Sequence, residues 1–234
     1  MKKIVTSLLV VFLVVTVHAQ VQWGVRAGGN MSSVLDKEDG RYEKLKLHPG
    51  FHVGGTADIF LSDKFSLQPA LLFTSKGFKV ANKSSNSFDL PDNANAKLTP
   101  YYLELPVNLI FKPRAGNGNL LLGAGPYIAY GVGGRWKATF KSEEVISVKG
   151  KLKFVNDYKG SMDSSSVENR TIPYTKPFDF GANLLLGYEF ANHFYLQLNG
   201  QLGLINVEPS YNGVSSGSSS VKNVQFGLSI GYKF

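Results

Sequence analysis

The chain has 234 residues, of which 43% are hydrophobic, 18% charged and 12% aromatic, and it contains no cysteine. Without cysteine there is no disulfide framework, no thiolate metal site and no cysteine nucleophile. Lysine and arginine number 25 against 17 aspartates and glutamates, a net charge of +8 that indicates anionic partners without naming one. The sequence also lacks the run of about 18 apolar residues that a membrane-spanning helix needs.

The first nineteen residues predict a secretory signal. Lys2 and Lys3 precede an apolar stretch, 4–17, which ends at Val17-His18-Ala19. A charged start, a short apolar segment and small residues at its end are typical of a cleaved export signal. As a helix the stretch would be about 21 Å long, too short for a hydrocarbon core of about 30 Å. We expect cleavage after Ala19, so that residues 20–234 form one mature domain.

From Val21 onward, apolar and polar residues alternate, as in β-strands with one apolar and one polar face. The pattern is clearest at the end of the chain, where Phe226, Leu228 and Ile230 are separated by glycine and serine. Eight segments follow this rule, although the fifth is rich in glycine and more weakly patterned. The expected strands cover residues 21–30, 51–61, 65–76, 103–112, 120–132, 178–190, 194–204 and 225–234.

The composition of the two faces indicates how such a sheet is turned. The polar faces are rich in Gly, Asn, Gln and Ser with few lysines, which is unusual for a solvated surface. The apolar faces carry bulky Leu and Phe, and about ten residues tilted by about 40° cover roughly 25 Å of membrane. A membrane barrel with lipid outside and a polar lumen fits better than a soluble periplasmic barrel that encloses an apolar ligand. Periodicity alone leaves both alternatives open.

The connections between the expected strands alternate in length. Those at 62–64, 113–119 and 191–193 are short, whereas those at 31–49, 80–100, 134–177 and 206–221 are long. Outer-membrane barrels have short periplasmic turns and long extracellular loops, and an even strand number returns both termini to the periplasm. We therefore expect an all-β fold, an eight-stranded antiparallel up-and-down transmembrane β-barrel located in the outer membrane.

Aromatic residues gather at the ends of the expected strands. Such rings of aromatics mark the two membrane interfaces of a barrel. The girdle expected on the periplasmic side consists of Trp23, Phe65, Phe111, Tyr188, Phe190, Phe194, Tyr232 and Phe234. Phe51, Phe73, Tyr101, Tyr130 and Phe178 fall at the opposite ends.

The alternation also predicts which polar side chains point into the lumen. They are Arg26, Asp58, Gln68, Glu104, Asn108, Lys112, Asp179, Asn183, Glu189, Gln197, Asn199, Gln201 and Lys233. Because eight strands leave room only for side chains and buried charges must be paired, we expect mixed-sign salt bridges that plug the lumen. A narrow ion path is the functional alternative.

Catalytic, cofactor and metal sites are not expected. The mature chain has three histidines, His48, His52 and His193, and none has metal-binding spacing. His52 could meet Asp179 and a serine at the outer rim, as in a membrane-embedded enzyme, but no nucleophile-elbow motif accompanies them. The glycine-rich pieces at 123–125 and 131–134 do not form a phosphate-binding motif. The protein is thus predicted to be no enzyme.

The longest connection, 134–177, is basic, with nine lysines and arginines against five acidic residues. Within it, 145–148 and 152–155 flank Lys149-Gly150-Lys151, which predicts a projecting hairpin with its turn at these three residues. The cationic rim could pair with the phosphates of lipopolysaccharide, or it is simply a solvated basic loop. Outer-membrane lipid is an expected partner, and nucleic acid is not.

The strand segments resemble the PorT family of outer-membrane β-barrel proteins of Gram-negative bacteria. The resemblance covers GVRAGGN, GFHVGGTADIFLSDKFSLQPALLFTSKG, YYLELPVNLIFK, LLGAGPYIAYGVGG, DFGANLLLGYEF, LGLINV and FGLSIGYKF, but not the long loops. It implies an eight-stranded barrel with a terminal aromatic strand that the barrel-insertion machinery reads. Ile230, Tyr232 and Phe234 occupy that position. The family's link to protein secretion is not carried over.

Overall fold

The computed structural model describes residues 21–38, 41–44, 46–81, 94–141, 145–158, 171–211 and 220–234. These residues form an all-β fold of fifteen strands without a helix. Nothing within them has the helical length and apolarity that would carry a chain across a membrane. The predicted export signal, 1–19, lies outside the described residues.

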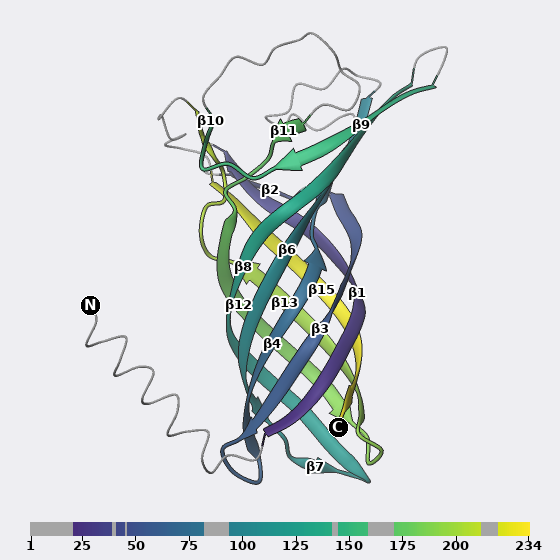
Figure 1. Ribbon diagram of the computed structural model, residues 1–234, viewed down its shortest axis with the longest axis vertical. Helices are drawn as coiled ribbons and strands as arrows, with labels where there is room; N and C mark the ends of the chain where they lie inside the picture. The colour runs from purple at the N-terminus through teal and green to yellow at the C-terminus, as the bar shows by residue number, and fades with distance from the viewer. Residues whose placement is uncertain are drawn as a thin grey trace, which may run out of the picture.

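Eight long strands pair side by side in a closed ring (Figure 1). Each is antiparallel to both neighbours, and the ring closes where the last strand pairs with the first, Gly24 opposite Lys233. In ring order the strands are β1 (Val21–Glu38), β3 (Lys46–Phe60), β4 (Phe65–Ser75), β6 (Ala94–Phe111), β8 (Gly118–Lys141), β12 (Phe178–Glu189), β13 (Phe194–Gly203) and β15 (Ser220–Lys233). The enclosed space is called the lumen below.

Seven further strands bring the described total to fifteen, more than the eight that the alternation predicts. They are β2 (Arg41–Lys44), β5 (Phe78–Ala81), β7 (Arg114–Ala115), β9 (Val145–Lys153), β10 (Asp157–Tyr158), β11 (Thr171–Pro173) and β14 (Ser210–Tyr211). Except for β7, they lie in connections predicted to be long loops. The ring strands β1, β6 and β8 also extend into those connections, which are therefore partly sheet rather than loop.

The two ends of the ring differ. The described start of the chain, Val21, and Phe234 lie at the same end as the short connections 61–64, 112–117 and 190–193 (Figure 1). We call this the terminal end. The opposite end carries β2, β5, β9, β10, β11 and β14 and is called the loop end.

Along most of the ring the apolar side chains lie outside. Leu105, Leu186 and Ile230 are 40%, 48% and 54% exposed, whereas Glu104 and Asn183 are 1% exposed. A soluble protein places these two classes the other way round, because apolar surface is unfavourable in water. The alternative interpretation, a soluble barrel with an apolar interior, is therefore wrong.

Near the loop end a β-bulge in β8 reverses this arrangement. Tyr101 pairs with Gly133 but Tyr102 pairs with Gly131, so Val132 has no partner in β6. An extra residue switches the side chains beyond it to the other face of the sheet. Before the bulge Tyr130 points outward, and after it Arg135 and Lys137 do so. Gly133 has φ 149°, a conformation that favours glycine.

The hairpin predicted in the long connection has a different turn. Lys149, Gly150 and Lys151 are not a turn but the middle of the continuous strand β9, paired with Lys137, Trp136 and Arg135 of β8. The prediction was wrong because the extension of β8 offers a free edge, along which β9 pairs through eight of its nine residues. The residues between β8 and β9, 142–144, lie outside the described part.

Candidate functional site

The lumen at the terminal end holds a cluster of two cations and two carboxylates. Lys233 Nζ lies 2.6 Å from Asp58 Oδ2 and contacts Glu189 Oε2, and Lys112 Nζ lies 3.3 Å from Asp58 Oδ2 and 3.8 Å from Glu189 Oε2. Gln68 Nε2 donates to Asp58 Oδ1 at 3.0 Å. Opposite charges balance here, which is the condition under which charges tolerate burial.

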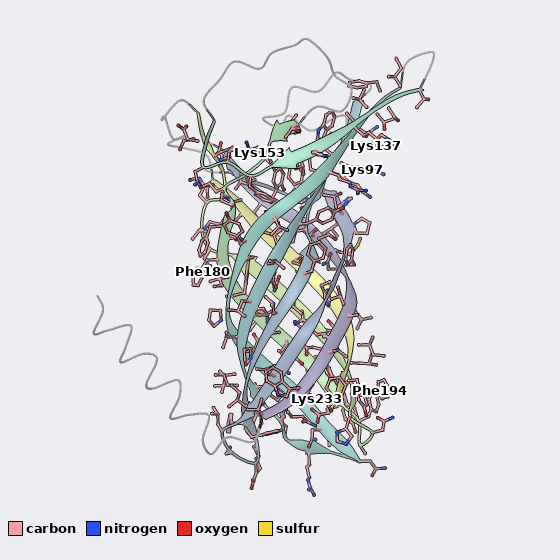
Figure 2. The ribbon with its side chains drawn as sticks, viewed as in Figure 1. Lys97, Lys137, Lys153, Phe180, Phe194 and Lys233 are labelled. Atoms are coloured by element: carbon pink, nitrogen blue, oxygen red, sulfur yellow. The ribbon has the colours of Figure 1, made fainter. Side chains whose placement is uncertain are left out.

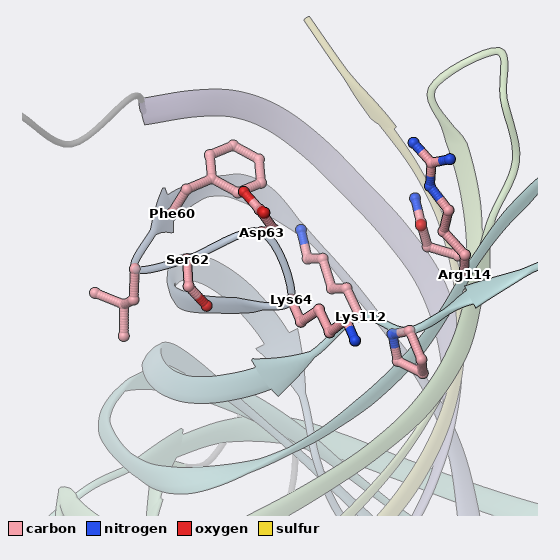
Figure 3. A pocket seen from close by; sticks show the side chains of 9 residues that line it. Phe60, Ser62, Asp63, Lys64, Lys112 and Arg114 are labelled. Atoms are coloured by element: carbon pink, nitrogen blue, oxygen red, sulfur yellow. The ribbon is translucent and has the colours of Figure 1, made fainter.

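A hollow of about 1070 Å³ opens at the terminal end (Figure 3). The turn between β3 and β4 contributes Phe60, Asp63 and Lys64, and the chain leading into β7 contributes Lys112 and Arg114. Lys112 Nζ also lies 5.0 Å from the centroid of the Phe60 ring. Because Lys112 belongs to both the hollow and the ion cluster, the hollow ends on paired charges.

An apolar layer follows the ion cluster along the lumen. Ile110, Leu121 and Tyr195 are fully buried and Leu185 is 5% exposed, and the four pack together. Gly231 of β15 makes room for the Tyr195 ring, since a Cβ there would overlap it. The alternation predicts a lumen plugged by polar side chains, and this apolar layer was not predicted. The sequence does indicate such a layer, because Ile110, Leu121 and Leu185 all occupy inward positions of their strands.

A second ion cluster lies on the other side of the apolar layer. Lys76 Nζ is 2.8 Å from Glu104 Oε2 and 3.5 Å from Asp179 Oδ2. The Tyr127 hydroxyl donates to Asp179 Oδ2 at 3.2 Å, and Gln201 Nε2 donates to Glu104 Oε1 at 2.6 Å. Lys76 Nζ also stands 4.5 Å from the Tyr127 ring centroid, a cation–π contact.

Among the described charged residues of the lumen, Lys76 is the one that the predicted set lacks. It follows the end of β4 and is 1% exposed, at the edge of a segment where the alternation fades. Arg26 was expected to join the salt bridges, yet it makes no ion pair with any described residue, although it is 3% exposed. Counting Arg26, the lumen holds four cations and four carboxylates among the described residues, so its formal charge is zero.

The structure places the other predicted lumen residues inside the ring as well. Asn183 Nδ2 donates to Asn108 Oδ1 at 2.7 Å, and the Ser229 hydroxyl donates to Asn199 Oδ1 at 3.3 Å. Gln197 is buried and Asn199 half-buried. The structure thus brings the predicted residues together in two ion clusters with amide pairs beside them.

The aromatics predicted for the periplasmic girdle lie around the terminal end. Trp23 and Phe234 are the most exposed, at 64% and 71%. Phe65 lies 5.1 Å from Phe111, Tyr188 5.0 Å from Phe190, and Phe194 4.9 Å from Tyr232, measured between ring centroids. Figure 2 shows Phe194 outside the ribbon and Lys233 at the same end.

An apolar cluster closes the lumen toward the loop end. Val34, Phe78, Leu98 and Leu152 are buried there, and Trp136 packs against them. The Phe154 ring is seated against Tyr102, with ring centroids 5.2 Å apart, and against Tyr174. Removal from water raises the pKa of the Tyr174 hydroxyl well above its usual value, so the group remains neutral.

The trio considered above as an alternative, in which His52 would meet Asp179 and a serine at the outer rim, is not formed by the described residues. His52 Nε2 lies 2.7 Å from the Ser229 hydroxyl, but His52 Nδ1 has no hydrogen-bond partner among the described residues. Asp179 is instead bound by Tyr127, Asn223 and Lys76. A serine–histidine pair needs a third group to orient the imidazole. The geometry therefore supplies a hydrogen bond, not a nucleophile–base relay.

Comparison with known proteins identifies the family. Residues 18–208 match the outer membrane protein beta-barrel domain. No curated protein sequence matches the chain. Among solved structures, OprG from Pseudomonas aeruginosa shares 17% identity over 93% of this chain and 97% of its own, with a TM-score of 0.41.

Two other solved structures give similar values. Ail from Yersinia pestis, in complex with the heparin analogue sucrose octasulfate, shares 16% identity over 92% of this chain and 99% of its own, with a TM-score of 0.39. The outer membrane protease OmpT from Escherichia coli shares 12% identity over 93% of this chain and 97% of its own, also at 0.39. These values carry no functional property to this chain. The family match, over most of the sequence, shows that the chain belongs to the outer membrane protein beta-barrel domain family and resides in the outer membrane.

Proposed function

We propose that the protein is a non-enzymatic outer-membrane barrel with eight spanning strands and a filled lumen, which serves as a structural or surface-interaction protein. The terminal end faces the periplasm and the loop end faces the outside of the cell. This orientation follows from the short connections at one end and the long ones at the other.

The observation that carries the proposal is the layered filling of the lumen. From Lys112, which follows β6, the inward side chains run along the strand through Ile110 and Glu104 to Leu98, and each belongs to a different buried cluster. An ion that crossed the protein would have to displace paired charges and then pass two apolar clusters. Both steps are costly, because a desolvated ion has no compensating ligands in an apolar layer. Function is then left to the segments at the loop end.

Conductance in planar lipid bilayers tests this proposal. The purified full-length protein is expected to give no stable current above the bare membrane, while a water-filled porin inserted in the same way conducts. A persistent open channel of the wild-type protein would contradict the filled lumen and would favour the ion path.

We also propose a family type, partners and a role for His52. We infer that the chain is of the PorT type and that the barrel-insertion machinery reads its last strand. Outer-membrane lipid around the ring is the other partner that we infer. We further propose that His52 has no catalytic role, which the missing partner of its Nδ1 supports.

A further inference from the structure

Basic residues stand in two rows on the outer face of the sheet at the loop end. Strand pairing places Lys79 opposite Lys97, Lys97 opposite Lys137, and Lys137 opposite Lys149, so four lysines cross four adjacent strands. The second row is Thr99, Arg135, Lys151 and Thr171, again directly opposite one another. We call these eight residues the cation rows. Figure 2 shows Lys97 and Lys137 side by side on the outside of the extension.

Placing cations directly opposite one another on neighbouring strands is unfavourable for strand pairing. Side chains directly opposite each other have Cβ atoms about 5 Å apart, and like charges in such positions destabilise a sheet. No ion pair within the described residues involves a member of the cation rows. The bulge at Val132 is what turns Arg135 and Lys137 outward, into line with Lys97. The fold thus concentrates on one surface positive charge with which no acidic residue of the described part forms an ion pair.

The surface is also hollowed. A pocket of about 730 Å³ is lined by members of both rows together with His48 and Trp136. At its edge Thr99 Oγ1 lies 2.9 Å from His48 Nε2. Ammonium, guanidinium and hydroxyl donors around one hollow match the acceptor oxygens of phosphate groups.

The height of the cation rows identifies the source of the phosphate. The outward face of β6 continues from Lys97 and Thr99 to Tyr101 and then to the exposed Leu103 and Leu105. Tyr101 stacks on Phe73, which contacts Phe51, so these three form part of the outer aromatic ring. Two to four strand residues above Tyr101 correspond to about 5 to 10 Å along the membrane normal. That is the depth of the lipid headgroups, which begin where the hydrocarbon ends.

We propose that the cation rows bind the phosphate groups of a phosphorylated glycolipid in the outer leaflet, with its acyl chains against the apolar outer face of β6 and β8. The rows lie on the lipid-facing side, directly above the apolar band, so a lipid reaches them without leaving the membrane. The inference rests on the outer-membrane location and on the proposed orientation. It does not depend on the filled lumen, because an open channel would leave the rows where they are.

The probe is bis-phosphorylated lipid A carrying a fluorescent acyl label, titrated into full-length protein in detergent. Phosphatase-treated lipid A with the same acyl chains is expected to bind at least about tenfold more weakly, since the charged hydrogen bonds are lost. Inorganic pyrophosphate represents a free phosphate, and heparin a soluble polyanion. Neither is expected to displace the lipid at comparable concentration. Equal binding of the dephosphorylated lipid, or displacement by either competitor, would overturn the proposal.

Variants locate the site. Arg135→Gln with Lys137→Gln is expected to weaken lipid A binding about tenfold. Lys64→Gln with Arg114→Gln, two exposed cations at the terminal end, removes the same charge and should leave binding unchanged. Arg135→Lys with Lys137→Arg keeps the charges and should keep the affinity. Heat-dependent gel migration checks that each variant is folded. Wild-type affinity of the first variant for lipid A, or an equal loss of affinity in either of the other two variants, would contradict the proposal.

Discussion

At the scale of single residues, Asp58 holds the terminal-end ion cluster together. Its carboxylate faces both Lys112 and Lys233. Asp58→Asn leaves two lysines with one carboxylate, Glu189, in a buried site. Removing one partner of a buried ion pair typically costs about 3–5 kcal/mol, because an uncompensated charge is left behind. We expect the free energy of unfolding to fall by about 3 kcal/mol, measured by urea titration in lipid vesicles.

A matched double variant separates charge imbalance from lost packing. Asp58→Asn with Lys112→Met leaves Lys233 paired with Glu189, so part of the lost stability should return. If the single variant is as stable as the wild type, or the double variant is the less stable of the two, charge balance does not govern this cluster.

At the scale of strands, the bulge at Val132 decides what the upper part of β8 presents to its surroundings. Deleting Val132 alone leaves Gly133 opposite Tyr101 and Lys137 opposite Lys97, so Lys137 should stay outward. Deleting Val132 together with Gly133 shifts every later residue by one more position, which should turn Lys137 inward and Trp136 outward. The natural chain has no cysteine, so single cysteines report accessibility cleanly. With the bulge, a membrane-impermeant maleimide should label Lys137→Cys faster than Trp136→Cys. In the single deletion the order should stay the same, and in the double deletion it should reverse. An unchanged order in the double deletion would show that the number of residues at the bulge does not set the faces.

The same strands show how far the sequence predicts the structure. Alternation predicted the ring strands because bulky residues such as Leu105 and Leu186 face lipid at every second position. It failed where the environment changes from lipid to water along one strand: above Tyr101 the outward positions of β6 become Thr99 and Lys97, while Leu98 becomes core. A prediction that rests on outward apolar residues therefore ends the strand at Tyr101 and assigns the residues above it to a loop.

Contacts within the lumen were less predictable than its residues. Alternation assigns a side chain to the interior, but the partner depends on the relative height of strands far apart in the sequence. Glu104 was expected to take part in a salt bridge, but its partner is Lys76, which the predicted lumen set does not contain. Lys76 is the last residue of the predicted strand 65–76 and lies just beyond the end of β4, and it was left out of the predicted lumen set. The apolar layer went unnoticed because Ile110, Leu121 and Leu185 belong to strands whose other inward residues are mostly polar or glycine.

At the scale of the whole molecule, closure of the ring depends on β15, which pairs with both β1 and β13. The backbone N–H of Phe234 donates to the Trp23 carbonyl at 2.8 Å, while the Phe234 side chain is 71% exposed. The aromatic ring of Phe234 therefore adds little to the stability of the folded state, although the backbone hydrogen bond helps to close the ring of strands.

If the insertion machinery reads this aromatic end, Phe234→Ala should slow assembly in cells while changing the stability of the refolded protein by no more than about 0.5 kcal/mol. Assembly is measured as the amount of heat-resistant folded protein in the membrane fraction over time after synthesis, and stability is measured by urea titration.

The control is Phe194→Ala, which removes an exposed aromatic at the same end within β13 and should assemble at the normal rate. Equal slowing of both variants would point to a general need for interfacial aromatics, and unimpaired assembly of Phe234→Ala would remove the terminal residue from the signal altogether.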